Sequence, residues 1–318
     1  DSLRENEVMS LKTRFGNLGN ILDFENLTRE NIYVLESPIL SNSQFEKFSL
    51  LFKNKLKVLD CTFNIQNNLK EKLDQLCSEA ETAVREGYKH LVLSDKKITE
   101  KKVPIPMILA FGAINSKLVD LGIRGFVSIN VQTAEALDTH SFAVLLGVGA
   151  TTINPYLVFD SIYQRYEKKL FRKFNYEECI QRYIKSVDSG LLKIMSKMGI
   201  SVLSSYRGGC NFETVGISRA IVAEYFPGII SRISGIGISG IEKKIKELHK
   251  KAFQKNISIL PIGGIYKYRK NGENHQYRGQ LIHLLQHAVT INSYETYKKY
   301  AQGIYNLPTI NLRDLLAF

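Results

Sequence analysis

The sequence has no long apolar run and no apolar leader, and each absence excludes a class of protein. No stretch of about 18 or more residues is both apolar and uncharged, so a membrane-spanning helix is not expected. Asp1, Arg4, Glu5 and Glu7 stand where a secretory signal would be apolar. We therefore expect a soluble intracellular protein without a membrane partner.

Paired cysteines are also missing. The four cysteines are Cys61, Cys77, Cys179 and Cys210, and no two of them have the Cys-x-x-Cys spacing. The six histidines do not fall near them in metal-ligand pairs. A disulfide framework or a zinc site is therefore not expected.

The net charge of +12 makes a polyanionic partner one alternative. Several lysine runs, such as "IEKKIKELHKKAFQK", carry glutamates at helical spacing, which is typical of solvated helix faces. Aromatic and basic residues also mix near the C-terminus, as on a single-strand nucleic-acid platform. Because Tyr294, Tyr297 and Tyr300 have helical spacing, packing of an arm explains them as well, and a basic nucleic-acid-binding module remains the less favoured alternative.

From residue 56 to residue 205 the chain alternates short apolar runs with amphipathic helical segments, which predicts a mainly parallel sheet with flanking helices. After residue 205 glycines cluster, and we expect less regular structure there apart from one basic helix. The predicted strands are "LKVLDCTF", "HLVLSD", "GFVSINVQTAEA", "ATTINPYL" and "ISVLSSY". The predicted helices cover about 68–87, 108–121, a short stretch from Ser141 capped by Asp138, 157–198 with a break near Phe174, and 239–254. The fold class is α/β, an incomplete (β/α) barrel-like sheet, followed by an irregular C-terminal arm with two short helices.

Polar side chains stand where the predicted strands end. Asp60, Asp95, Gln132 and Ser204 all lie on the edge at which α/β proteins usually bind ligands. The pair Asp60 and Asp95 could act in general acid–base catalysis or bind a metal ion, although aspartates that follow strands more often accept hydrogen bonds from turn amides. His140 could act as an acid or base, but it or Asp138 more simply caps a helix.

The stretch "SYRGGCNFETVG" leaves three interpretations open. Arg207, Gly208 and Gly209 have the shape of a phosphate cradle, but the turn lacks both common phosphate-loop spacings. Cys210 would need a nearby base to act as a nucleophile, and no histidine lies close in sequence. The third interpretation, a structural turn after a buried strand, is favoured; "GIGISG" at 235–240 is a weaker phosphate candidate still.

Several long motifs resemble the central region of the large subunit of glutamate synthase. They include "ENEVMSLKTRFGNLGNIL", "TAEALDTHSFAVLLGVGATTINPYL", "GLLKIMSKMGISVLSSYRGG", "FPGIISRISGIG", "GGIYKYRKNGENHQY" and "LRDLLAF". They occur in the family's order and cover almost the whole chain. In the family pattern the position of Cys210 is not characteristically cysteine, which lowers the nucleophile interpretation further.

The resemblance implies a part of a larger enzyme that makes two glutamates from glutamine, 2-oxoglutarate and a reductant. Residues 1–40 would be a connector from an amidotransferase domain, 41–255 the central domain, and 256–318 an arm that leads to an FMN-binding barrel. FMN and a 3Fe-4S cluster are expected in the intact protein, and no catalytic, cofactor or metal residue in this chain. A cytoplasmic or plastid location is implied, while the electron donor and oligomeric state stay open.

The role implied for this chain is to connect the two catalytic domains and to wall the tunnel through which ammonia passes. Gly19, Asn20 and Ile21 resemble the family's loop near the tunnel entrance, and their backbone carbonyls could bind ammonia in transit. The implied partners are the amidotransferase and FMN-binding domains of the same polypeptide, with a small subunit or ferredoxin as further candidates. An independent barrel-type enzyme that binds a phosphate-bearing cofactor at Arg207, Gly208 and Gly209 remains an alternative.

Overall fold

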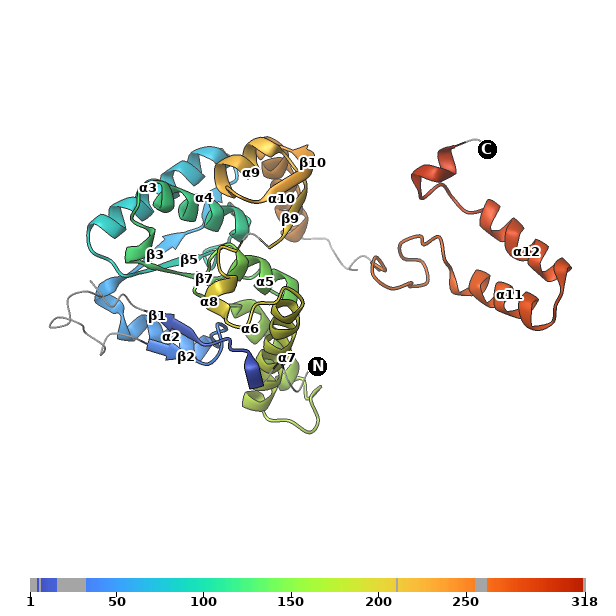
Figure 1. Cartoon of the computed structure of the whole chain (residues 1–318), viewed down its shortest axis with the longest axis horizontal. Helices are drawn as coiled ribbons and strands as arrows, with labels where there is room; N and C mark the ends of the chain where they lie inside the picture. Colours follow the sequence, from blue (N-terminus) through green and yellow to red (C-terminus); the bar gives the residue numbers. More distant parts are fainter. Residues whose placement is uncertain (1–4, 6, 16–32, 210, 255–261, 317–318) are drawn as a thin grey trace. The chain divides into compact units, whose positions relative to one another are not determined.

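The structure is a computed structural model that describes residues 5, 7–15, 33–209, 211–254 and 262–316 (Figure 1). The chain divides into two compact units, Asp1–Phe253 and Gln254–Phe318. Each unit is treated by itself below.

A four-stranded, all-parallel sheet organises the first unit. Its strands are β3 (Leu56–Asp60), β5 (His90–Ser94), β7 (Ser128–Gln132) and β8 (Thr152–Asn154), in that spatial order. Neighbouring strands in space are also successive along the sheet's sequence, as right-handed βαβ crossovers would give. The predicted α/β class and mainly parallel sheet are confirmed, and within the described residues the sheet does not close into a barrel.

The two faces of this sheet differ in character. One face carries apolar residues such as Leu91, Ile129 and Ile153, which belong to the main hydrophobic core. The other face carries Ser94, Asn130 and Thr152 and packs against a smaller cluster around Phe45 and Phe48 of α2. Figure 1 shows α3 and α4 on one side of the sheet and α2 on the other.

The helices over the apolar face follow the predicted pattern. α3 (Leu69–Arg85) buries Leu69, Leu73, Leu76, Ala80, Ala83 and Val84, a spacing of three and four residues, and Asn68 caps its N-terminus. α4 (Met107–Asp120) and α5 (Thr139–Gly147) are also largely buried on the side that meets the core. The predicted break near Phe174 separates α6 (Tyr156–Glu167) from α7 (Tyr176–Lys197).

The sheet gains a further neighbour beyond β8. The backbone of Ile153 accepts a hydrogen bond from Leu40 and donates one to Pro38, so residues 38–40 run parallel to β8. This segment leads into α2 (Asn42–Leu51), whose first turn is held by a capping box between Ser41 and Gln44. The lead-in thereby places α2 on the polar face of the sheet.

Two small antiparallel pairs complete this part. β1 (Thr13–Phe15) pairs with β2 (Tyr33–Leu35), and β4 (Thr62–Asn64) pairs with β6 (Lys102–Pro104). Short 3-10 turns lie at Lys53–Lys55 and Arg124–Phe126.

The prediction of a buried strand at residues 200–206 is wrong. Val202 forms a single bridge with Ser10, and Leu203–Tyr206 is a short helix, α8. Leu203 and Tyr206 are both buried while Ser204 and Ser205 between them are exposed, a helical spacing that an alternating strand would not give. Gly208 and Gly209 therefore follow a helical turn, and Ser204 does not lie at a strand end.

Regular structure continues after residue 205, contrary to expectation. β9 (Glu213–Ile217) and β10 (Ile230–Ile236) form a parallel pair joined by α9 (Arg219–Tyr225). A Cβ on Gly235 would lie 2.1 Å from the carbonyl oxygen of Gly216, so glycine at this position permits the close approach of the two strands. The basic helix predicted at 239–254 is present as α10 (Ile238–Ala252).

The second unit holds the two short helices predicted for the C-terminal arm. These are α11 (Gly279–Thr290) and α12 (Tyr294–Tyr305), followed by the 3-10 turn Leu312–Leu315. Leu281 of α11 packs beside Gly303 of α12. Across the described residues of both units, no helix combines the length and apolar character needed to cross a bilayer.

Candidate functional site

Four polar residues lie at or directly after the carboxyl ends of the parallel strands, the edge at which α/β proteins usually bind ligands. Asp60 ends β3, Asp95 directly follows β5, and Gln132 ends β7, as the sequence predicts. Asn154 ends β8 and joins this group, although the sequence analysis did not single it out. Its position one residue before Pro155, at a strand end equivalent to that of Gln132, was the available signal.

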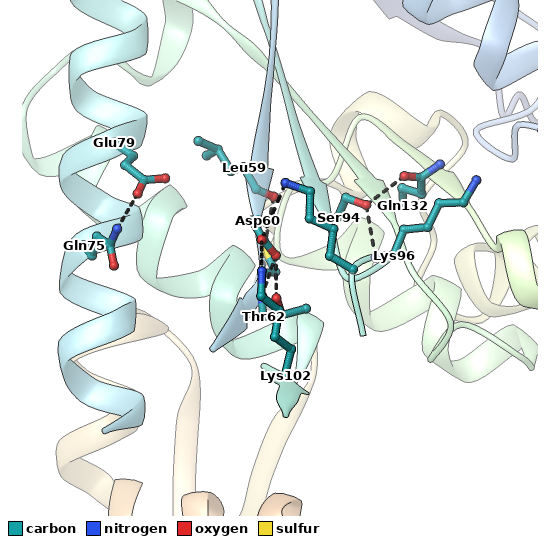
Figure 2. A network of polar contacts seen from close by, with 11 residues as sticks. Leu59, Asp60, Thr62, Gln75, Glu79, Ser94, Lys96, Lys102 and Gln132 are labelled. Carbon is teal, nitrogen blue, oxygen red and sulfur yellow. Dashed lines mark hydrogen bonds and ion pairs between the residues drawn. The ribbon is translucent and has the colours of Figure 1, made fainter. Parts of the chain in front are cut away.

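Neutral side chains on this edge form a hydrogen-bonded line that we call the polar row: Ser94, Gln132 and Asn154. The Ser94 hydroxyl donates to Gln132 Oε1 at 2.7 Å (Figure 2), and Gln132 Nε2 donates to Asn154 Oδ1 at 3.2 Å. Asn154 Nδ2 then donates to the carbonyl oxygen of Leu40 at 2.9 Å and to Asn42 Oδ1 at 3.0 Å. All three members of the polar row are buried, so their polar groups are directed at one another and not at solvent.

Asp95 is fully buried behind this row. Its carboxylate accepts hydrogen bonds from the Thr133 hydroxyl at 2.6 Å and from the backbone amide of Ala134 at 3.0 Å. Burial raises the pKa of Asp95 above its usual value, although the hydrogen bonds from Thr133, Ala134 and Tyr156 oppose this. The carboxylate acts as an internal brace between β5 and the loop after β7.

Asp60 is also engaged by its neighbours. It accepts hydrogen bonds from the hydroxyl and the amide of Thr62, at 2.6 and 3.1 Å, and Lys102 and Lys97 lie 3.5 and 3.7 Å from Oδ2 (Figure 2). Partial burial alone would raise its pKa, but the Thr62 hydrogen bond and the two lysine charges together hold the pKa below its usual value. Asp60 is thus an ordinary ionised carboxylate that satisfies a turn.

The two aspartates therefore take the structural role that the sequence analysis weighted above catalysis. Each accepts a backbone amide close to a strand end, as expected for aspartates in turns. Cys61 directly follows Asp60, and burial, together with the negative charges of Asp95 and Asp60, raises the pKa of its thiol far above the usual value. Within the described ranges, no three His, Cys, Asp or Glu side chains are grouped as metal ligands.

The turn at Arg207, Gly208 and Gly209 does not form a backbone cradle. The amide of Gly208 donates to Gly147 O at 2.8 Å, and that of Gly209 donates to Tyr206 O at 3.2 Å. Both N–H groups that a phosphate would require are thus used within the fold. The candidate nucleophile Cys210 lies outside the described residues.

The side chain of Arg207 faces the opposite, amino edge of the sheet. Its Nη2 donates to the Thr13 hydroxyl and to the carbonyl oxygen of Thr151, each at 2.9 Å. Thr151 directly precedes β8, so Arg207 ties the α8 turn and β1 to the start of that strand. The sequence alone left the direction of the Arg207 side chain open, and these two contacts place it at the amino edge.

A second arginine, which the sequence analysis missed, lies beside Arg207. Arg124 Nε donates to Asn115 Oδ1 at 2.7 Å, Nη1 to Val127 O at 2.7 Å, and Nη2 to Gly149 O at 3.2 Å. Arg124 stands between Gly122 and Gly125 just before a buried strand, a location where a long charged side chain is unusual. That context was the signal in the sequence.

The remaining candidates are dispersed. Asp138 caps α5 by accepting a hydrogen bond from the Ser141 amide at 2.9 Å, as predicted, while His140 is exposed on the same turn. In the second unit, Tyr297 lies between Tyr294 and Tyr300 on α12 with ring centroids 6.0 and 5.9 Å away. The glycines of 235–240 belong to the end of β10 and the start of α10. Gly19, Asn20 and Ile21 lie outside the described residues.

Taken together, the fold and this edge define an α/β domain with a braced polar face, in which the polar side chains serve the architecture. A family model described as the glutamate synthase central domain matches residues 1–218, and the chain belongs to that family.

Full-length relatives agree with this assignment. The chain is 49% identical over 319 residues to the glutamate synthase [NADPH] large chain of Azospirillum brasilense, covering 99% of this chain and 21% of that one. It is 37% identical to the corresponding chain of Bacillus subtilis (strain 168), covering 100% of this chain and 21% of that one. It is 36% identical to the ferredoxin-dependent glutamate synthase 1 of Arabidopsis thaliana, covering 100% and 20%. The chain thus spans about a fifth of the length of these relatives.

Proposed function

We propose that this chain is the scaffold and ammonia-tunnel-wall domain of a glutamate synthase, and that it is not catalytic by itself. Such an enzyme converts glutamine, 2-oxoglutarate and a reductant into two glutamates, with ammonia carried from one catalytic domain to the other. The observation that carries the proposal is membership of the central-domain family combined with a carboxyl edge whose polar groups bind one another.

The chemistry of that edge suits a wall. Acid–base or nucleophilic catalysis requires a side chain that can reach a substrate, whereas Asp95 and the polar row are buried. A wall for a small neutral molecule requires a closed surface that does not exchange protons with it. The saturated hydrogen bonds of Ser94, Gln132 and Asn154 meet that requirement without a titrating group.

The proposal includes a division of the chain. Residues 1–40 connect to an amidotransferase domain, residues 41–255 form the central domain, and residues 256–318 lead to an FMN-binding barrel with a 3Fe-4S cluster. Both cofactors would belong to the flanking parts of the polypeptide. A small subunit or ferredoxin would deliver electrons, and the enzyme would work in the cytoplasm or in a plastid.

A first experiment tests whether the chain has activity of its own. The purified 318-residue chain is expected to be colourless and to show neither glutaminase activity nor glutamate synthesis from glutamine and 2-oxoglutarate. A stoichiometric flavin absorbance band, or turnover in either assay, would contradict the proposal.

A second experiment tests the wall in the intact large chain. Gly19, Asn20 and Ile21 are the proposed tunnel residues, so Asn20→Trp should narrow the passage. Glutaminase activity should continue while glutamate synthesis from glutamine falls, and free ammonia should appear in the medium. The matched control is Asn67→Trp at an exposed turn position, which should keep the two activities coupled. Equal coupling in both variants would overturn the assignment of these residues.

A further inference from the structure

A cavity at the amino edge of the sheet has a composition that a wall does not require. It encloses about 390 Å³ beside the starts of β5, β7 and β8, a volume within the usual range of small-molecule sites. Among the described residues that line it, four are cations, namely Arg14, Lys89, Arg124 and Arg207, and none is acidic. We call it the cationic cavity.

The two arginines are held in place by neutral groups. Their five hydrogen bonds go to the side chains of Asn115 and Thr13 and to three backbone carbonyls. Among the residues that the structure describes, no carboxylate forms an ion pair with either guanidinium. Buried charges are normally paired, so this arrangement leaves positive charge without an internal counterion.

The orientation of Arg207 leaves donors available. Both of its hydrogen bonds leave from Nη2, while Nε is buried with no partner in the described part of the chain. A buried N–H without an acceptor is costly, and it is rare in folded proteins. Because Arg207 lines the cavity and has no carboxylate partner among the described residues, its guanidinium charge is available to an oxyanion that enters the cavity.

The electrostatics of the cavity also favour an anion. Burial and, as the smaller cause, the nearby charge of Arg124 together lower the pKa of Arg207 to about 10. Burial likewise lowers the pKa of Arg124 to about 10. Both groups are still protonated at neutral pH, so both present a positive charge to the cavity.

We propose that the cationic cavity is a binding site for a small anionic ligand carrying a phosphate group or two carboxylates. Arg207 and Arg124 bind the oxyanion from the inner wall, and Arg14 and Lys89 add positive charge beside it. The apolar residues Val119, Phe126 and Val148 provide a surface for the organic part of such a ligand. This site is separate from the proposed wall role, and either proposal can fail without the other.

The test is calorimetric titration of the 318-residue chain at constant ionic strength, with inorganic phosphate in one series and succinate in the other. Saturable binding of one anion per chain is expected, and the tighter of the two identifies the group that the cavity prefers. Arg207→Gln should weaken binding at least about tenfold, since it removes charge-assisted hydrogen bonds. Arg85→Gln, an exposed arginine on α3, is the matched control and should leave binding unchanged.

Arg14→Ser keeps the test decisive if Arg207→Gln does not fold. Arg14 is exposed and lines the cavity, so its loss should weaken binding several-fold while the circular dichroism spectrum is retained. Absence of saturable binding of both anions at millimolar concentrations would overturn the proposal. Binding that neither Arg207→Gln nor Arg14→Ser weakens would overturn it as well, because the anion would then lie elsewhere.

Discussion

The two edges of the parallel sheet differ in how their polar and charged side chains are compensated. At the carboxyl edge, neutral side chains of the polar row bind one another, and Asp60 has two lysines within ion-pair distance. At the amino edge, four cations line a cavity at which the described residues include no acid. Parallel α/β sheets usually bind ligands at their carboxyl edge, so this domain reverses the customary arrangement.

A ligand can add stability where the fold leaves a charge or a hydrogen-bonding group without a partner. The comparison shows that this matters more than the edge of the sheet at which the group lies. Asp95 is more deeply buried than Arg207, yet its oxygens receive hydrogen bonds from Thr133 and Ala134. Arg207 keeps a buried Nε without an acceptor among the described residues. A ligand at the carboxyl edge would have to displace existing hydrogen bonds, whereas an anion at the amino edge would supply negative charge that the described lining lacks.

The largest loss of stability is expected from a substitution that breaks the polar row. Asn154→Leu keeps the side-chain volume similar but leaves Gln132 Nε2, Leu40 O and Asn42 Oδ1 without their partner. We expect a loss of about 4 kcal/mol in the free energy of unfolding, because several buried groups lose hydrogen bonds at once. Urea denaturation measures it. Asn67→Leu at an exposed position is the control and should change stability by less than about 0.5 kcal/mol; equal effects would mean that the row is not a stabilising unit.

A pH titration of stability should reveal a buried neutral histidine at the amino edge. Burial, assisted by the charge of Lys55, lowers the pKa of His90 to about 4 from its usual 6.5. The unfolded chain therefore takes up the proton first, and stability is lost as pH falls from about 6.5 to 4. The contribution is roughly 3 kcal/mol in total, from the size of the pKa shift.

The matching variant is His90→Phe, which retains the aromatic packing against Phe48 and Phe52. The difference between the wild-type and variant unfolding free energies should shift by that amount across the window. A difference that stays constant with pH would show that His90 does not titrate there in either state.

A buried carboxylate should give the opposite slope. Burial raises the pKa of Asp188 to about 6 from its usual 3.8, although the hydrogen bond from Ser37 at 2.8 Å opposes this. The folded chain therefore holds the proton more tightly, and stability is lost as pH rises from about 4 to 6. Asp188→Asn should add up to about 3 kcal/mol at pH 8 and almost nothing at pH 4, as measured by urea denaturation. A destabilised variant at pH 8 would contradict this account.

The smallest effects are expected from removing one lysine charge at each edge, and the resulting changes in stability should have opposite signs. Lys89→Gln removes one of the like charges at the cationic cavity and should stabilise slightly in chloride buffer. Lys97→Gln removes a cation 3.7 Å from Asp60 and should destabilise slightly. Each change is expected to be below about 0.5 kcal/mol, as for exposed ion pairs. Thermal unfolding at low salt measures both changes in stability. If both variants were stabilised or both destabilised, the two edges would not differ electrostatically in the way described.

Much of the fold was predictable from local patterns. The alternation of apolar runs with amphipathic segments predicted the four strands of the parallel sheet, β3, β5, β7 and β8, and the helices from α3 to α7, and the Asp138 cap was placed correctly. The stretch 200–206 was misassigned because two buried residues three apart were taken as part of an apolar run. β9 and β10 were missed because glycines in a sequence usually indicate loops. Here Gly216 and Gly235 instead allow the two strands to approach closely, a contact that the sequence does not reveal.

The candidate sites were harder to predict, because they depend on which partners reach each side chain. Sequence position placed Asp60, Asp95 and Gln132 on one edge, but only the contacts show that they are satisfied there. Arg207 was singled out beside its glycines, yet its direction depends on Thr13, almost two hundred residues away. Arg124 gives no motif, and its role emerges only where Gly149 and Thr151 bring the two arginines together.

The polar row has a consequence for folding errors. Sliding one strand past its neighbour by two residues would keep the same face buried, so apolar contacts alone discriminate weakly against that mistake. It would, however, separate Ser94 from Gln132 or Gln132 from Asn154 and leave buried amide groups without partners. The polar row thus discriminates against misaligned pairing of β5, β7 and β8, and this lowers the chance that the chain is trapped in a misfolded sheet.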